Sequence, residues 1–230
     1  MNKRAIPVVA LLASAYAIIG LLPGLPIVGV SGSEIDLVRS LEPAYGILLG
    51  PAFGTIAAFL GALVGKLISG DSIGLLFTPL ALISTFIVAI LYRRTIFGIA
   101  GWAISVGILL SLTLGWYLHP AGISVPYYTI PHLIAIIILI IFRSNLSNML
   151  RSDSKRQLAL GVLLSSFPAT MAGNMLGNLI FMAVFNPPPL FFAALLPIMV
   201  AERLLISFLS VALSVPLILA VRNLYPHIIE

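Results

Sequence analysis

The chain has 230 residues, of which 60% are hydrophobic and only 8% are charged, and its mean hydropathy is +1.17. Because a water-soluble domain carries about 25% charged residues, this composition excludes an ordinary soluble fold and predicts an all-α membrane protein. Cysteine is absent, which excludes disulfides, thiolate metal sites and cysteine nucleophiles.

Apolar runs between Pro/Gly clusters and charged patches predict a single domain over residues 1–230, built as a polytopic membrane helix bundle. A helix needs about 20 apolar residues to cross the hydrocarbon, and the runs give about eight such transmembrane helices. In chain order we place them at about 5–22, 35–49, 52–69, 73–92, 96–118, 129–142, 158–185 and 191–221.

The first two predicted helices each leave an alternative. The first run follows Lys3-Arg4 and passes a small-residue pattern at 13–15 that suits a signal-peptide cleavage site, but it continues to Leu22, so we expect an uncleaved helix. The second helix is short and carries three charged residues. Merging it with the third across Gly50-Pro51 would give seven helices instead of eight.

The distribution of positive charge favours eight helices with both termini in the cytoplasm, because Lys and Arg collect in cytoplasmic loops. The expected outer segments, 23–34, 70–72, 119–128 and 186–190, contain no Lys or Arg. The sequence thus predicts a multi-pass protein of the cell membrane, and topology accounts for the net charge of +5 without a nucleic-acid partner. The expected inner segments hold Lys3, Arg4, Arg93, Arg94, Arg143, Arg151, Lys155, Arg156 and Arg222.

Charged residues inside predicted helices need a reason, because each costs about 2.5–3.5 kcal/mol at the centre of a membrane helix. They are Asp36, Arg39, Glu42, Glu202 and Arg203. Asp36, Arg39 and Glu42 are three residues apart and share one side of a helix. Glu202 and Arg203 point about 100° apart, so we expect each to pair with another helix. The charges could form a structural ion-pair network or line a ligand cavity near the outer leaflet. Lys66 lies at the outer end of its helix, where it can reach water, and is left out of the site.

The predicted helix 158–185 carries a polar stripe, Ser166, Thr170, Asn174 and Asn178, beside Gly173 and Gly177. Polar and small residues at helical spacing can simply join helices in a membrane. Two asparagines on one face, in the helix just before Glu202 and Arg203, favour a binding wall instead.

Small residues Ala10, Ala13, Ala17 and Gly20 share a face of the first helix. Such a seam lets another helix approach closely. The other helix could belong to this chain or to a partner.

No catalytic signature or phosphate-binding loop is present, so we expect neither enzymatic activity nor a cofactor. His119 and His132 flank an outer loop, and two histidines do not make a metal site. Aromatic residues near the predicted helix ends, including Trp116, Tyr127 and Tyr128, are typical of the membrane interface.

The first four predicted helices follow a recognisable order. An alanine-rich helix leads into the Pro/Gly loop Leu22-Pro23-Gly24-Leu25-Pro26, a short polar helix, the turn Leu49-Gly50-Pro51-Ala52-Phe53-Gly54 and a glycine-rich helix at 59–65. This order resembles the substrate-binding subunits, or S-components, of energy-coupling factor (ECF) transporters for vitamins. Residues 158–221 resemble the closing helix pair of the same family.

The resemblance implies a six-helix core over 1–94 and 157–222, with 95–142 as an inserted helix pair that the family lacks. It implies capture of a small vitamin-like molecule from outside, followed by reorientation driven by ATPase subunits through an ECF coupling transmembrane subunit. Ala13 and Ala17 would match the face that docks on that subunit, and loop 23–34 would cover the substrate. Ligand contacts would come from Asn174, Asn178, Glu202 and Arg203. The cobalt and nickel branch has a histidine after the initiator methionine, where this chain has Asn2, so a metal substrate is not expected.

The charges of the predicted site favour a cationic or zwitterionic ligand. Asp36, Glu42 and Glu202 outnumber Arg39 and Arg203 by one, or by two if Glu34 is included. Two other functions fit the same residues. The carboxylates could relay protons in a self-sufficient secondary transporter, or the charges could only fix packing in a structural membrane subunit.

Overall fold

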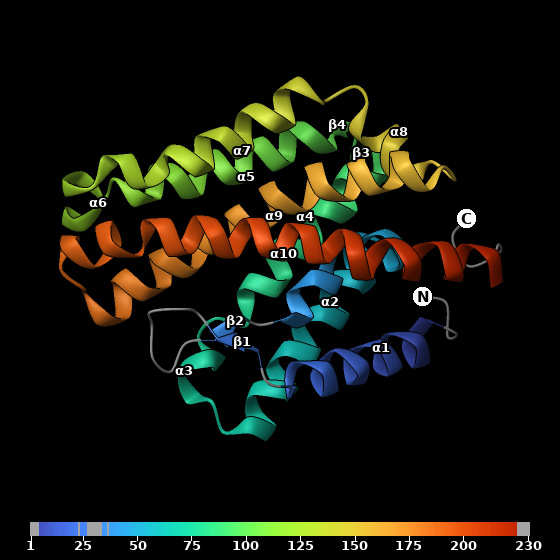
Figure 1. Ribbon diagram of the computed structural model, residues 1–230, viewed down its shortest axis with the longest axis horizontal. Helices are drawn as coiled ribbons and strands as arrows, with labels where there is room; N and C mark the ends of the chain where they lie inside the picture. The colour runs from blue at the N-terminus through green and yellow to red at the C-terminus, as the bar shows by residue number, and fades with distance from the viewer. Residues whose placement is uncertain (1–4, 23, 27–33, 36, 225–230) are drawn as a thin grey trace.

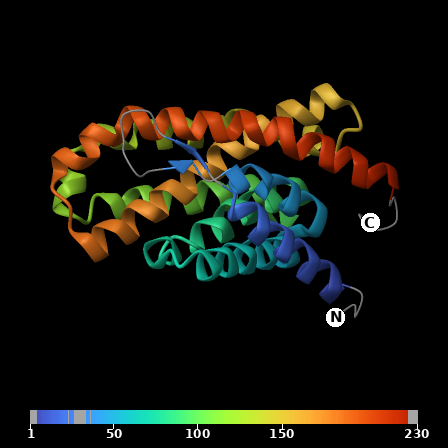
Figure 2. The ribbon, with the colours of Figure 1, turned by 60° about the horizontal axis from the view of Figure 1, so that its bottom comes forward.

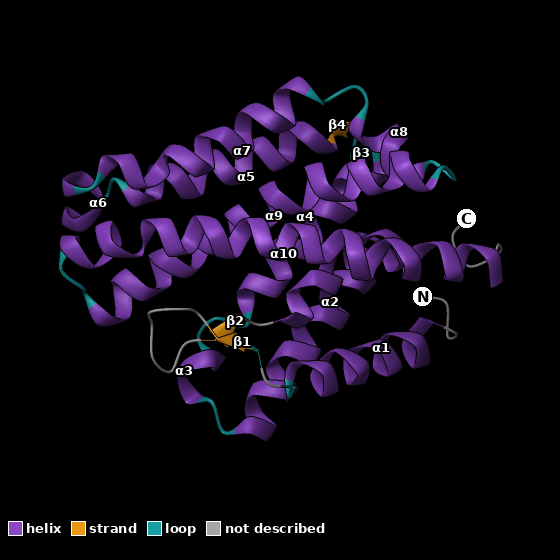
Figure 3. Cartoon of the chain, in the orientation of Figure 1, coloured by secondary structure: helices purple, strands orange, loops and turns teal. Residues whose placement is uncertain are grey.

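The computed structural model describes residues 5–22, 24–26, 34, 35 and 37–224. This part of the chain is all-α apart from two short antiparallel hairpins (Figures 1 and 3). In chain order the elements are α1 (Ala5–Gly20), β1 (Leu25–Pro26), β2 (Glu34–Ile35), the 3₁₀ helix η1 (Leu37–Leu41), α2 (Glu42–Ser69), α3 (Ser72–Leu75), α4 (Pro79–Arg93), β3 (Thr95–Ile96), β4 (Ile99–Ala100), α5 (Gly101–Trp116), α6 (Pro120–Ser124), the 3₁₀ helix η2 (Pro126–Thr129), α7 (Ile130–Ile141), α8 (Leu146–Arg151), α9 (Lys155–Phe185) and α10 (Pro189–Leu224).

Helix α4 is central because it packs against both α2 and α9. On one side, α1 covers α2, and their contact forms a small core around Tyr16, Tyr45 and Ala57. On the other side, α5 and α7 pack on each other and on α9, while α10 runs along α9 (Figures 1 and 2). A larger core joins α4, α5, α7, α9 and α10.

The chain turns sharply within α2. Gly50 has φ 75° and ψ −177°, which is not helical, and Pro51 follows it. A Cβ placed on Gly54 would lie only 2.3 Å from the carbonyl oxygen of Tyr45. In a straight helix, two residues nine positions apart would be separated by about 13 Å. Residues after Gly50 therefore run back beside residues 42–49, and one straight helix across Gly50-Pro51, which the seven-helix alternative requires, is wrong.

Three other predicted boundaries differ from the structure. The predicted helix 35–49 begins with strand β2 and a 3₁₀ turn, and α2 starts only at Glu42. The predicted helix 73–92 is divided into α3 and α4, because Pro79 begins a new helix. The start predicted at 96 is wrong, because 95–100 form the β3–β4 hairpin around Gly98, whose φ is +79°.

The two last predicted helices are confirmed and extend slightly further, as α9 and α10. Among the described residues, three stretches are long and apolar enough to span a membrane: 37–69, which contains the Gly50 turn, 155–185 and 189–224. Shorter apolar helical stretches cover 9–20, 79–93, 101–116 and 126–141. The coarse prediction of an apolar helical bundle, with helices long and apolar enough to span a membrane, is thus confirmed.

Several basic residues gather at one end of the bundle. Arg151 donates from Nε to the carbonyl of Tyr92 and from Nη2 to that of Arg93, at 2.9 and 3.0 Å. Arg222 donates to the carbonyls of Leu150 and Ser152. These contacts bring the ends of α4, α8 and α10 together. In Figure 1 this end carries α8 and the β3–β4 hairpin, whereas α3 and α6 lie toward the other end.

Candidate ligand-binding cavity

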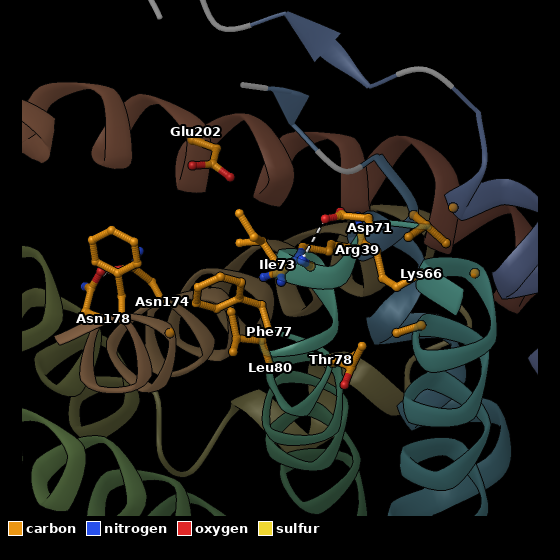
Figure 4. A pocket seen from close by; sticks show the side chains of 18 of the residues that line it. Arg39, Lys66, Asp71, Ile73, Phe77, Thr78, Leu80, Asn174, Asn178 and Glu202 are labelled. Atoms are coloured by element: carbon orange, nitrogen blue, oxygen red, sulfur yellow. Dashed lines mark hydrogen bonds and ion pairs between the residues drawn. The ribbon is translucent and has the colours of Figure 1, made fainter. Parts of the chain in front are cut away.

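A cavity of about 500 Å³ lies where η1, the ends of α1 and α2, the α3 turn, the start of α4, and the facing parts of α9 and α10 meet. It is on the α3 side of the bundle, away from the end where the arginines gather (Figures 1 and 4). Five predicted ligand-binding residues line it, namely Arg39, Asn174, Asn178, Glu202 and Arg203. The structure therefore brings together residues that are far apart in the sequence.

Of the two other predicted site residues, Glu42 is described and does not line the cavity. Asp36 lies outside the described residues. Glu42 is 2% exposed and sits behind the cavity wall, where it accepts a hydrogen bond of 3.0 Å from the hydroxyl of Tyr16. Tyr16 itself lines the cavity. Glu42 thus contacts the wall from behind.

Glu202 and Arg203 pair with each other, so the expectation that each pairs with another helix is wrong. Arg203 Nη2 donates to Glu202 Oε1. Their long side chains bridge the angle between neighbouring positions on α10. Arg203 is 6% exposed, and its Nε and Nη1 have no acceptor among the described residues. Within the described part of the chain, the guanidinium is therefore only partly satisfied.

Lys66 and Asp71 form a second ion pair at the cavity, which the sequence analysis missed because Lys66 was assigned to the water interface. Their Nζ and Oδ2 atoms are 3.0 Å apart. Asp71 Oδ1 also accepts from the Gly74 amide at 2.8 Å, which caps α3. The Gly74 N–H first, and then the Lys66 hydrogen bond, hold the pKa of Asp71 below its ordinary value of 3.8. The sequence signal that could have predicted this ion pair is the spacing of five residues between Lys66 and Asp71, with Gly70 at the turn between them.

The two asparagines belong to a hydrogen-bonded network behind the cavity wall. Asn178 Nδ2 donates to the Tyr128 hydroxyl at 3.2 Å and to Asn174 Oδ1 at 3.1 Å. His132 Nε2 lies 3.2 Å from the same Asn174 oxygen. His132 is fully buried and Tyr128 is 1% exposed. Residues 95–142, expected to be an unexplained insertion, therefore contribute side chains that contact the wall of the cavity.

The interface assignment of the aromatic residues is wrong for two of them. Trp116 is fully buried and stacks on Tyr128, with ring centroids 4.7 Å apart, in the larger core. Tyr127 is exposed, as expected of an interface residue. The cavity also has an aromatic wall, in which Phe181 stacks on Phe191 at 5.2 Å.

The small residues of α1 are used mainly within the chain. A Cβ on Gly61 would lie 2.7 Å from the Ala13 carbonyl oxygen, and one on Gly65 would lie 3.3 Å from that of Ala17. Ala17 is 3% exposed, so it cannot contact a partner while α1 stays in place. Of the predicted partner interface, Ala10 is the exposed member. The intramolecular alternative therefore holds for Ala13 and Ala17.

The charges around the cavity are nearly balanced. Among the described lining residues, Arg39, Lys66 and Arg203 face Asp71 and Glu202. The expected net negative charge counted Asp36, which lies outside the described residues, and Glu42, which sits behind Tyr16. Two ion pairs, two amides and an aromatic wall suit a small, polar ligand without a large net charge.

Comparison with known proteins identifies one distant relative. An uncharacterized protein of Methanocaldococcus jannaschii is 25% identical to the chain over 180 residues, which is 78% of this chain and 59% of the relative. The chain therefore spans less than two thirds of the length of this relative. No protein-family model and no solved structure matches the chain.

Proposed function

We propose that this chain is the substrate-binding membrane subunit of an ECF-type ATP-driven importer, and that the cavity captures a small vitamin-like molecule from outside the cell. The observation that carries the proposal is the cavity of about 500 Å³ in an apolar bundle, with charged and amide side chains on its wall. Cavities of this size and composition are typical of small-molecule sites. The ECF assignment rests on the resemblance of the first four and last two helices to S-components.

Arg203 has N–H groups without acceptors among the described residues, which favours ligand capture over a purely structural role. A buried N–H without an acceptor costs about 1–3 kcal/mol, and Arg203 has such groups at Nε and Nη1 among the described contacts. A network that only fixed helix packing would be expected to satisfy them. An incoming ligand or its water can supply the missing acceptors after a small rotation of the side chain.

In the proposed orientation the chain crosses the membrane eight times, with both termini and the arginine-rich end in the cytoplasm. The cavity then opens toward the outer leaflet. This chain supplies affinity and selectivity, whereas ATP hydrolysis takes place on partner subunits. The proposed cycle needs no enzymatic activity and no bound cofactor in this chain.

A self-sufficient proton-coupled transporter is the second candidate. The specific observation in its favour is that Ala13 and Ala17 pack on Gly61 and Gly65. In an S-component these alanines would dock on the coupling subunit. Because they pack within this chain instead, they no longer support the presence of such a partner. Glu202, at 19% side-chain exposure beside the cavity, is a carboxylate that could carry a proton.

Native mass spectrometry of the full chain, purified in mild detergent, tests ligand capture. We expect a small molecule to copurify with the wild type and to be lost from Ala62→Phe, which places a ring at the cavity wall. The matched control is Ala52→Phe, at an exposed position of the same helix, which should retain the molecule. A wild type without bound small molecule, or equal retention by both variants, would contradict capture in this cavity.

Uptake in whole cells separates the two transport candidates. For an ECF subunit, uptake of the copurified molecule should require coexpressed coupling and ATPase subunits and should persist briefly after the proton gradient is collapsed. Uptake by the chain alone that stops with a protonophore would establish the secondary transporter instead.

A further inference from the structure

The network behind Asn174 and Asn178 fixes which hydrogen-bonding atoms these amides offer to the cavity. Both residues line the cavity and are half-buried, and they lie one helical turn apart on α9 (Figure 4). An asparagine amide has one acceptor oxygen and one donor nitrogen, so its orientation decides what a ligand meets.

Asn178 retains only its acceptor. Both hydrogens of its Nδ2 are used, one toward the Tyr128 hydroxyl at 3.2 Å and the other toward Asn174 Oδ1 at 3.1 Å. Tyr128 is 1% exposed, so it holds this amide from the protein side. The remaining polar atom of Asn178 is Oδ1, which can accept a hydrogen bond from a ligand.

Asn174 retains only its donor. Its Oδ1 accepts from Asn178 and lies 3.2 Å from His132 Nε2. With Oδ1 of Asn174 as the acceptor, Nε2 of a neutral His132 is the donor. The two lone pairs of Oδ1 are then occupied, which leaves Nδ2 of Asn174, near Tyr128, as the atom that can donate to a ligand.

We propose that this pair recognises a neutral amide-like edge, that is, a carboxamide, lactam or ureide group. Its carbonyl oxygen would accept from Asn174 Nδ2, and its N–H would donate to Asn178 Oδ1. A carboxylate offers no N–H to Asn178, and an ammonium offers no acceptor to Asn174, so each matches only half of the pair. The inference deepens the proposed function and rests on the cavity being a ligand site.

The rest of the wall agrees with a neutral, planar head group. Of the three cations in the lining, Arg39, Lys66 and Arg203, the last two already face Asp71 and Glu202, respectively. Phe181 and Phe191 stack at the same cavity and offer a flat apolar surface to the remainder of a ligand. The preferred ligand is thus an aromatic or heterocyclic ring that bears the amide edge.

Three probes with one ring test this assignment: benzamide, benzoate and benzylammonium. A Kd of about 1 mM is ordinary for ligands this small, so binding to the purified full chain is measured by ligand-observed NMR at up to about 20 mM. We expect the wild type to bind benzamide roughly tenfold more tightly than the other two, which is the usual effect of one unmatched hydrogen bond. Displacement by the copurified molecule locates the binding in the same cavity.

The variant Asn174→Asp replaces the donor with an acceptor of the same shape. We expect it to lose the preference for benzamide and to favour benzylammonium. The matched control Asn145→Asp, at an exposed position before α8, should keep the wild-type preference. This reversal does not arise from general destabilisation, which would weaken all three probes together.

Two other outcomes separate the inference from the function on which it rests. If benzoate or benzylammonium binds best to the wild type, or if Asn174→Asp keeps the preference for benzamide, the amide-edge inference is wrong while ligand capture stands. If no probe binds and no small molecule copurifies, both the inference and the proposed function are wrong.

Discussion

At the scale of single residues, arginine side chains hold the arginine-rich end of the bundle together by binding backbone carbonyls. Arg151 uses two nitrogens of its planar guanidinium on the carbonyls that end α4 and also lies over the ring of Tyr92 at 5.3 Å. A lysine carries the same charge but cannot reproduce this fork.

Arg151→Lys should therefore destabilise the chain although the charge is unchanged. Each lost hydrogen bond is worth about 0.5–1.5 kcal/mol, so we expect a melting temperature a few degrees lower in detergent, by roughly 2–4 °C per kcal/mol. Arg156→Lys, at an exposed position in the first turn of α9, is the control and should melt like the wild type. Equal melting temperatures of the two variants would show that the paired hydrogen bonds of Arg151 contribute no stability.

Asp71 gives a residue-scale prediction for pH. The Gly74 N–H and Lys66 hold the pKa of Asp71 below 3.8 in the folded chain. A carboxyl with a depressed folded pKa contributes stability above its unfolded pKa and loses that contribution as the pH falls through the folded pKa. Asp71→Asn should therefore melt below the wild type at pH 7.

The difference between Asp71→Asn and the wild type should shrink below pH 3.8 and disappear once Asp71 is protonated. Asp153→Asn, at an exposed turn between α8 and α9, controls for the general effect of removing a carboxylate. A constant difference across this range of pH would mean that the charge of Asp71 is not what stabilises the turn.

The residues of the candidate site differ in how far the sequence could predict them. Asn174 and Asn178 could be predicted because their spacing of four residues puts them on one helix face. Their partners His132 and Tyr128 could not, since these lie 42 and 50 positions away in the chain. Likewise, the pairing of Glu202 with Arg203 could not be predicted. Neighbouring positions on a helix point about 100° apart, and only the structure shows that the two long side chains bend toward each other.

At the scale of elements, glycines decide how closely helices and turns approach. Gly54 lies against the backbone of Tyr45 where the chain turns back after Gly50, so Gly54→Ala would place a Cβ 2.3 Å from a carbonyl oxygen. Backbone cannot move aside as a side chain can. We expect a loss of stability of about 1–3 kcal/mol or more.

Gly107→Ala is the matched control, because Gly107 is also helical and a Cβ there would meet nothing within 4 Å. Alanine at an open helical site should stabilise by about 0.5–1 kcal/mol. Thermal melting of both variants in the same detergent measures the contrast. Similar melting of Gly54→Ala and the wild type would show that α2 does not turn back at Gly50.

Long apolar elements could be predicted well, and the breaks between them less well. Gly50-Pro51 signalled its turn because proline and glycine both interrupt helices. The β3–β4 hairpin could not be seen, because Ile96, Phe97 and Ile99 continue an apolar run into α5. There Phe97 and Gly98 both adopt positive φ, and a phenylalanine carries no signal for that conformation.

At the scale of the whole molecule, the eight-helix proposal requires the shorter apolar stretches to cross the bilayer as well. The stretch 126–141 is apolar but short. At 1.5 Å per residue its 16 residues span roughly 24 Å, whereas the hydrocarbon is about 30 Å thick. A crossing here requires local thinning of the bilayer or help from flanking residues. This stretch shares the shortfall with 79–93 and 101–116, and its crossing is one direct test of the eight-helix proposal.

The absence of cysteine allows a direct test, because one introduced thiol gives no background. Ser124→Cys and Ser144→Cys lie at exposed positions on either side of residues 126–141. If this stretch crosses, an impermeant maleimide should label Ser124→Cys in intact cells and Ser144→Cys only in inverted vesicles. Labelling of both from the same side would mean that α7 does not cross. The N- and C-termini could then not lie on the same side of the membrane, as eight crossings require. The cavity would have to be assigned to a different face of the membrane.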